Sequence, residues 1–132
     1  MISCHVYTPS GKKLDLQTEI VSIGTTDGRR GILPGHMPII LTVQASRFST
    51  LVNGVHEHYA VSDGILSFRN NECNIFVDAI ESQKDIDVER AQKAAERANK
   101  RISSPKPNTD LRRAEIALRK ALNRIQVSSY RE

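Results

Sequence analysis

The feature of this sequence that most constrains its fold is a change of hydrophobic period near residue 84. Before that point, short segments of alternating apolar and polar residues are separated by turn residues, which is typical of β-strands. After it, the segments 85–102 and 111–127 lack Gly and Pro and carry apolar residues three and four apart, as amphipathic helices do. The change predicts a strand domain over residues 1–84 and a helical domain over residues 85–132.

Frequent turn signals divide the first part into about eight short strands. The step Asn53-Gly54 indicates a β-hairpin, because both central residues of such a turn take positive φ angles. Asp63-Gly64 and Asn70-Asn71 mark further turns. Many short strands at close spacing favour a β-sandwich or a flattened barrel. The predicted strands are 2–7, 18–26, 39–43, 48–52, 56–61, 65–69 and 73–77.

The two helical segments predict an antiparallel αα-hairpin, because only a short breaker with Pro105 and Pro107 separates them. Asp85 or Asp87 is expected to cap the first helix. The seam is mostly alanine on the first helix, so it buries little apolar area, and we expect the hairpin to dock, open or swing. The predicted seam residues are Val88, Ala91, Ala95, Ala98 and Ile102, and then Leu111, Ala114, Leu118, Ala121 and Ile125.

Charge is distributed unevenly between the two parts. Residues 1–84 carry seven Lys/Arg against eight Asp/Glu, whereas residues 85–132 carry twelve against seven. Any acidic partner is therefore expected at the helical part. Its outer cations could meet a nucleic acid, an anionic membrane or an acidic protein surface, or form a solvated face with i,i+4 pairs. These cations are Arg112, Arg113, Arg119, Lys120 and Arg124.

No motif indicates catalysis, and no apolar run approaches the roughly 20 residues that span a bilayer. The small apolar stripe argues against membrane insertion, and the scarcity of aromatic residues argues against nucleic-acid binding. Ser62-Asp63-Gly64 lacks the pattern of a nucleophile elbow, and no paired carboxylates have glycosidase-like placement.

The histidines and cysteines do not predict a metal site. His56 and His58 share one face of a strand, and Cys73 or His5 could approach them, but we expect exposed histidines without a metal. Cys4 and Cys73 lack a Cys-x-x-Cys spacing and fit a reducing compartment, so no disulfide is expected.

The segment "GILPGHMP" places two glycines, two prolines and a histidine within residues 31–38. It is not a phosphate-binding loop, because no Lys-Ser or Lys-Thr follows. Prolines fix φ and glycines let another backbone approach, so the segment is either a rigid protein-contact loop or a tight connection between strands.

The start of the first helix brings a carboxylate and cations onto one face. Asp87, Arg90 and Arg97 are one and two turns apart, and in a hairpin Lys120 and Arg124 would come close to the same end. A helix N-terminus with several cations suits a nucleoside triphosphate. The alternative is a network of salt bridges within the hairpin.

Taken together and in order, these segments resemble the epsilon subunit of the bacterial F-type ATP synthase over essentially the whole chain. The segments that carry the resemblance are "GILPGHMPII", "YAVSDGILSFRNNECNIFVDAIE", "DIDVERAQKAAERANKRI" and "RRAEIALRKALNRIQV". The resemblance implies an antiparallel β-sandwich of about ten strands in two five-stranded sheets, followed by the hairpin. It also implies a non-catalytic central-stalk subunit, peripheral at the cytoplasmic face of the cell membrane, that binds the gamma subunit and the ring of c subunits.

By the same resemblance, the stiff loop faces the gamma subunit and the c-ring. Gly31, Pro34, Gly35, His36 and Pro38 match the family pattern. The turn before this loop departs from the family pattern, because Arg29 and Arg30 stand where similar proteins often have an acidic residue. A salt bridge between this turn and a loop of the c-ring would therefore need its charges arranged otherwise. Asp63 also departs, since a glycine is usual at that turn.

The helical part resembles a regulatory domain that folds beside the sandwich or extends along gamma. Extended, its basic second helix would meet acidic segments of the catalytic beta subunits, within the alpha/beta assembly, and stop rotation in the hydrolysis direction. No cofactor is required, but some members bind ATP through residues that match here, with Lys120 in place of an arginine. The implied ATP-binding residues are Glu81, Ile86, Asp87, Arg90, Ala91, Arg97, Lys120 and Arg124.

Two other classes of function stay open from the residues alone. A free-standing ATP sensor would bind nucleotide tightly without any partner. A nucleic-acid-binding protein with a basic helical tail would bind DNA with a steep dependence on salt.

Overall fold

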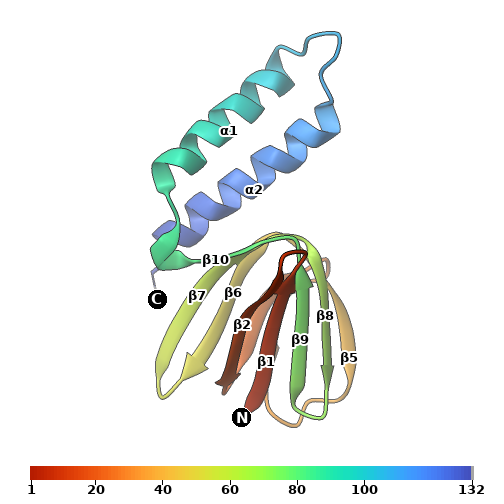
Figure 1. The fold of residues 1–132 in the computed structure, drawn as a ribbon, viewed down its shortest axis with the longest axis vertical. Coiled ribbons are helices and arrows are strands. Elements are labelled where there is room, and N and C mark those ends of the chain that lie inside the picture. Colours follow the sequence, from red (N-terminus) through yellow and green to blue (C-terminus); the bar gives the residue numbers. More distant parts are fainter. Residues whose placement is uncertain (132) are drawn as a thin grey trace. The chain divides into compact units, whose positions relative to one another are not determined.

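The computed structural model describes residues 1–131 and divides the chain into two compact units, Met1–Gln83 and Lys84–Glu132. We call the first the body and the second the hairpin (Figure 1). The body contains β1 Ile2–Thr8, β2 Gly11–Thr18, β3 Val21–Thr25, β4 Gly28–Ile32, β5 Ile39–Val43, β6 Ser46–Val52, β7 Val55–Val61, β8 Gly64–Arg69, β9 Glu72–Val77 and β10 Ile80–Ser82. The short 3-10 turn η1 Gln83–Asp85 leads to α1 Val88–Ser103 and α2 Leu111–Ser129.

The body is a sandwich of two five-stranded layers. Its strands follow one hydrogen-bonded path, β10-β7-β6-β3-β5-β8-β9-β1-β2, with β4 beside β3. The path is joined in its middle by a single residue pair, Thr25 of β3 and Val43 of β5, so β10-β7-β6-β3-β4 and β5-β8-β9-β1-β2 form separate layers. The predicted sandwich is confirmed. One pairing departs from the antiparallel prediction, because β1 runs parallel to β9.

Alternation along the strands fills the space between the layers. In β1, Ile2, Cys4 and Val6 are buried while the residues between them are partly exposed, as expected for strands with one face on a core. Phe48 and Phe68 are the largest fully buried side chains, one from each layer. The core therefore rests on aliphatic residues around two aromatic rings.

The sequence did not predict three of the strands, β2, β4 and β10. The predicted strand 18–26 is in fact the end of β2 at Thr18, a turn, and then β3. The Thr18 hydroxyl makes that turn, since it donates to the carbonyl of Ile20 at 2.8 Å and accepts from the amide of Leu51 at 2.9 Å. Both β2 and β4 end their layers, where a weak apolar pattern suffices to form a strand.

The turns follow the sequence signals with one exception. Asn53 and Gly54 both have positive φ, as predicted, and so do Asn70 and Asn71. Gly64 has no positive φ and is required for another reason, because a Cβ there would lie 1.9 Å from the carbonyl oxygen of Phe76. The Asp63 side chain accepts a hydrogen bond from the amide of Ala45 at 2.7 Å.

The hairpin consists of α1 and α2, which pack against each other. Of the two possible caps, Asp87 is used: its carboxylate accepts from the amide of Arg90 at 3.0 Å, and Asp110 caps α2 on Arg113 in the same way. The seam buries Ala91, Ala98, Ala114, Ala121 and Val127. Val88 and Leu111 were predicted in the seam, but they are the first residues of their helices and are 38% and 44% exposed. Neither described helix is long and apolar enough to cross a membrane.

Candidate functional site

The loop between β4 and β5 is a built, rigid feature of the body. Its first two predicted residues, Gly31 and Ile32, belong to β4. Leu33, Pro34, Gly35 and His36 then form a turn closed by a hydrogen bond from the His36 amide to the Leu33 carbonyl at 3.2 Å. Proline at the second position and a glycine at φ 84° at the third are the residues that a type II turn requires. The sequence and the geometry therefore agree on a stiff loop.

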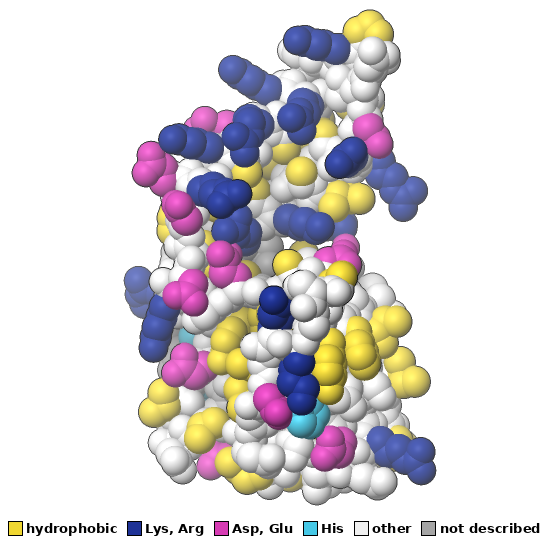
Figure 2. All heavy atoms as spheres, viewed as in Figure 1, with side chains coloured by type: hydrophobic (Ala, Val, Ile, Leu, Met, Phe, Trp, Pro, Cys, Tyr) yellow, Lys and Arg dark blue, Asp and Glu magenta, His cyan; other side chains and the backbone are white. Residues whose placement is uncertain are grey.

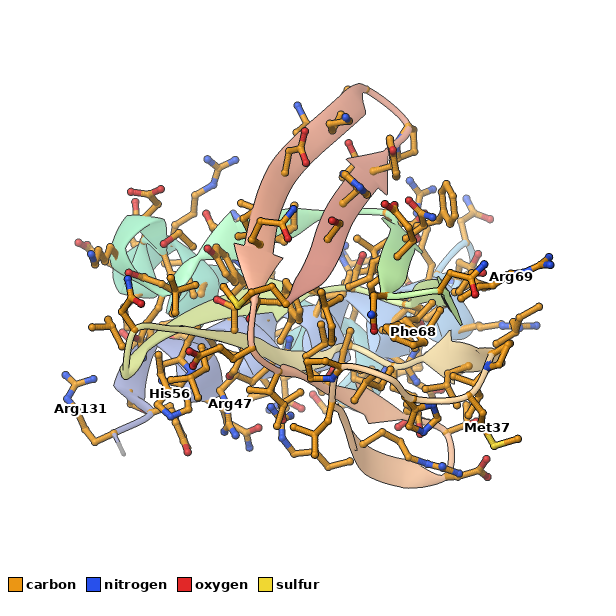
Figure 3. All side chains as sticks on the ribbon, turned by 90° about the horizontal axis from the view of Figure 1, so that it is seen from below. Met37, Arg47, His56, Phe68, Arg69 and Arg131 are labelled. Carbon is orange, nitrogen blue, oxygen red and sulfur yellow. The ribbon has the colours of Figure 1, made fainter. Side chains whose placement is uncertain are left out.

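Contacts from distant segments fasten this loop. The amide of Gly35 donates to the Asn71 side chain of the β8–β9 turn at 2.7 Å. The His36 ring stands edge-on to the buried ring of Phe68, with centroids 5.9 Å apart, and its Nδ1 lies 2.7 Å from the Met37 carbonyl oxygen. Figure 3 shows Phe68 among the strands and Met37 pointing away from them. The loop is therefore held at its base, while its tip is exposed.

The tip of the loop is apolar and uncovered. Met37 is 71% exposed and Leu33 is 58% exposed, next to Pro34 and Pro38. Of the two preceding arginines, Arg29 is tied to the body, because its guanidinium donates to the Arg47 carbonyl at 2.7 Å. Arg30 is exposed on the same strand. Arg30 is therefore an exposed cation on the strand that leads into the apolar tip.

Sequence reasoning missed a second apolar surface, which we call the outer strip. It lies on the outer face of the layer β5-β8-β9-β1-β2, where Ile65, Phe76 and Tyr7 are aligned by strand pairing. Phe76 stacks on Tyr7 with ring centroids 5.2 Å apart, and Ile40 of β5 is 75% exposed. The signal was present as apolar residues at the outward positions of alternating strands. Contiguous exposed apolar side chains of this kind mark interaction surfaces.

The predicted ATP-binding residues fall into separate places. Asp87, Arg90 and Arg97 line one recess of about 380 Å³ on α1, together with Glu89 and Lys93. Lys93 is paired there with Glu89 at 3.4 Å, while Arg90 and Arg97 have no acidic partner among the described residues. The Asp87 carboxylate is already engaged as the cap of α1. The recess thus offers two unpaired guanidinium groups.

The remaining predicted ATP-binding residues do not line this recess. Ile86 and Ala91 are buried, and Ala91 belongs to the seam. Lys120 and Arg124 are on α2, outside the recess, and Glu81 is on β10 of the body. The cations that were predicted to meet an acidic protein surface all belong to α2. Figure 2 shows that Lys and Arg side chains cover much of the visible face of the hairpin.

The histidine and cysteine pairs adopt local arrangements. His58 was expected to be exposed, but it is buried, and its Nδ1 is satisfied by the hydroxyl of Ser49 on the neighbouring strand, 2.7 Å away. His56 stacks on it with ring centroids 6.0 Å apart.

Cys4 and Cys73 are free thiols, buried opposite each other on β1 and β9. Their mutual hydrogen bond, together with burial, raises the pKa of the Cys73 thiol far above its usual range. The described residues contain no cluster of three metal-ligating side chains.

Comparison with known proteins assigns both units to one family. Residues 1–83 match the β-sandwich domain, and residues 84–129 the long α-helix domain, of the ATP synthase delta/epsilon chain. The ATP synthase epsilon chain of Halalkalibacterium halodurans is 42% identical over 127 residues, covering 94% of each chain. That of Bacillus velezensis is 37% identical over 127 residues, covering 96% of each chain.

A solved structure supports the fold. A chain in the cryo-EM structure of the Euglena gracilis mitochondrial ATP synthase superposes with a TM-score of 0.81 at 22% identity, covering 92% of this chain and 78% of that one. Its low identity bears on the fold alone, whereas the bacterial relatives match in sequence along almost their whole length. The chain therefore belongs to the ATP synthase epsilon-chain family.

Proposed function

We propose that this chain is the epsilon subunit of the central stalk of a proton-translocating F-type ATP synthase. The observation that carries the proposal is the match of both units, in order, to the two domains of ATP synthase delta/epsilon chains. The subunit would be non-catalytic and would require no cofactor. It would lie at the cytoplasmic face of the bacterial membrane, attached to it only through the complex.

The body would couple the gamma subunit to the c-ring through two surfaces. The loop supports this role because it is fastened at Asn71 and Phe68 and presents Leu33 and Met37 at its tip. The outer strip around Phe76 offers a second apolar surface on the same unit. A part that transmits torque needs contacts that do not yield, and a turn fixed by proline and side-chain hydrogen bonds supplies one.

The hairpin would restrain ATP hydrolysis when it opens and extends. Its seam of small side chains gives little burial to hold it closed, which supports a change of conformation. The cations of α2 would then meet acidic segments of the beta subunits, where opposite charge speeds encounter and fixes orientation. The cations proposed for this contact are Arg112, Arg113, Arg119, Lys120 and Arg124.

Removing residues 85–132 tests this restraint in the assembled enzyme. The truncated subunit should still assemble and support ATP synthesis, while ATP hydrolysis should rise. A matched control replaces the five α2 cations by Gln in the full chain, which removes their charge and keeps the helix. Hydrolysis unchanged by both variants would contradict the restraint without affecting the assignment to the stalk.

The loop contact has its own test. Leu33→Glu should reduce recovery of the gamma subunit and c-ring with this chain, because it places a charge on the apolar tip. Val55 is the matched control, since it is also 58% exposed but lies at the β6–β7 turn. Equal loss with Leu33→Glu and Val55→Glu would show that the loop is not the contact.

Nucleotide sensing by the folded hairpin is the finer part of the proposal. Arg90 and Arg97 line the recess beside the α1 cap and are available for a triphosphate. Calorimetric titration of the full chain with ATP should show binding that Arg90→Ala abolishes and that Lys13→Ala, in the body, leaves intact. Binding that survives Arg90→Ala would place the nucleotide elsewhere.

A further inference from the structure

A second hollow lies at the loop end of the hairpin, and we call it the tip pocket. It has a volume of about 860 Å³ and is formed by the later turns of α1, the connecting loop and the first turn of α2. Its charged lining residues are Arg97, Lys100, Arg101, Lys106, Asp110 and Arg113. The α2 cations Lys120 and Arg124 do not line it, nor does Arg90. The tip pocket is therefore distinct from the recess at the start of α1, with Arg97 between the two.

The charges of the tip pocket are not balanced within the protein. Five cations face one carboxylate, which leaves a net charge of +4 on a concave surface. None of the five has a salt bridge to an acidic side chain among residues 1–131. The one carboxylate, on Asp110, is already an acceptor for the amide of Arg113. A concave surface lined by one sign of charge concentrates potential and attracts counter-ions.

The loop holds part of this surface in place. The amide of Lys106 donates to the Thr109 hydroxyl at 2.9 Å, and the Thr109 amide donates back to the Lys106 carbonyl at 2.9 Å. This double link fixes the backbone that carries Lys106, just before the cap of α2. The Lys106 ammonium therefore extends from a defined position between the two helices.

We propose that the tip pocket binds an oligophosphate chain, either free or as part of a nucleotide. Guanidinium groups pair with phosphate oxygens in a bidentate way, and three of the five cations are arginines. The volume is within the range of small-molecule pockets, roughly 300–1,000 Å³. Ala114 is the only apolar lining residue, so the pocket would recognise a phosphate chain chiefly by charge.

Binding there would act on the hairpin as a whole. Arg97, Lys100 and Arg101 belong to α1, whereas Lys106 and Arg113 belong to the loop and α2, so their mutual repulsion opposes the closed arrangement. An oligophosphate between them removes this repulsion and links both helices. Because it binds only the closed hairpin, it shifts the population toward that state. The inference does not depend on the role of the hairpin in the enzyme.

The direct test is calorimetric titration of the full chain with sodium tripolyphosphate at low ionic strength. The double variant Arg101→Gln/Arg113→Gln should weaken binding about tenfold or more, as expected when charge-assisted hydrogen bonds are lost. Arg112→Gln is the matched control, since it removes one exposed cation next to Arg113 that does not line the pocket. It should change the affinity by less than about twofold, as screened surface charges do.

Several outcomes would overturn the proposal. No binding of tripolyphosphate, or equal weakening by Arg112→Gln, would mean that the cations only attract a diffuse ion atmosphere. Stronger binding of a glutamate decapeptide would identify a docking surface for acidic protein. Loss of tripolyphosphate binding in Arg90→Ala would show that the ligand binds the recess at the start of α1 and not the tip pocket.

ATP distinguishes the two forms of the ligand. If the Arg90→Ala chain binds ATP as tightly as tripolyphosphate, and the double variant loses this binding, the tip pocket accepts the phosphate chain of a nucleotide.

Discussion

The body and the hairpin bury different kinds of side chain. The body closes two layers over large residues such as Phe48, Phe68 and Leu66, all fully buried. The hairpin closes mainly over Ala91, Ala98, Ala114 and Ala121, each of which removes much less apolar area from water. Since hydrophobic stabilisation scales with that area, at about 25 cal/mol per Å², the hairpin gains far less from closing.

This difference supports the division of work that we propose for the chain. Large buried residues and ladder hydrogen bonds make the body a part that keeps its form under load. The hairpin has a small seam and an excess of positive charge, twelve Lys/Arg against seven Asp/Glu over residues 85–132, so both its packing and its charge leave it ready to open. The chain therefore offers the rigid part and the responsive part that the proposed function requires.

Truncating the body core should give the largest effect. Phe48→Ala removes a fully buried ring that stacks on Tyr59 and should cost about 3–5 kcal/mol of unfolding free energy. Urea denaturation followed by tyrosine fluorescence measures it, since the chain has no tryptophan. Ile65→Ala, on the exposed outer strip, is the control and should stay within about 0.5 kcal/mol. Similar costs for both would show that the body is not organised around Phe48.

Enlarging a seam alanine should give the next largest effect. Ala98 is 1% exposed, and Ala98→Leu forces α1 and α2 apart, which should cost the closed hairpin about 1–3 kcal/mol. Thermal loss of helical circular dichroism would report it. Ala117→Leu is matched in chemistry but lies on the exposed face of α2, so it should leave the melting curve in place. If Ala117→Leu is equally harmful, close approach of the helices is not what the alanines provide.

Local features could be predicted from the sequence because they depend on neighbouring residues. A few neighbouring positions predicted the turn at Asn53-Gly54 and the stiff turn at Pro34-Gly35, and they narrowed the cap of α1 to Asp85 or Asp87. Each follows from the φ angle that a residue allows, or from a side chain that reaches an amide three residues on. The division into strands before residue 84 and helices after it also followed from a local pattern, the spacing of apolar residues.

Features that depend on distant pairing could not be predicted. The parallel pairing of β1 and β9, which brings Cys4 opposite Cys73, joins the two ends of the body. Buried His58 finds its hydrogen-bond partner, Ser49, across a strand pair. The strand β4 has only Ile32 buried and is formed by pairing with β3. No local pattern carries that information.

The candidate site shows the same limit. Asp87, Arg90 and Arg97 share one recess because their spacing fixes them on one helix face. Lys120 and Arg124 were placed near them by assuming a register between the helices, and they do not line that recess. An alanine seam specifies register weakly, since small side chains interlock little.

Removing the cap of α2 should have a smaller effect than overpacking the seam. Asp110→Ala leaves the Arg113 amide without its acceptor and should cost about 1 kcal/mol, measured as a lower melting point of the helices. Asp110→Asn separates the two roles of this residue, because it keeps the capping oxygen but removes the only carboxylate of the tip pocket. The variant Asp110→Asn should therefore have the melting point of the unchanged hairpin. Equal destabilisation by both variants would mean that the negative charge of Asp110, and not its capping oxygen, stabilises this end of the hairpin.

The smallest expected effect is on the acid stability of the body. The Lys12 ammonium, 3.3 Å from Asp15, lowers the pKa of this carboxyl below its usual 3.8, and His5, 2.7 Å away, acts in the same direction. Because the folded-state pKa is depressed, the contribution is present above pH 3.8 and is lost as the pH falls through the lower folded value. The carboxyl is exposed, so salt should weaken the effect. Asp15→Asn and Lys12→Gln should each flatten the acid limb of the urea midpoint against pH, and the double variant should add nothing. Additive changes would mean that Asp15 and Lys12 act separately, and not as an ion pair.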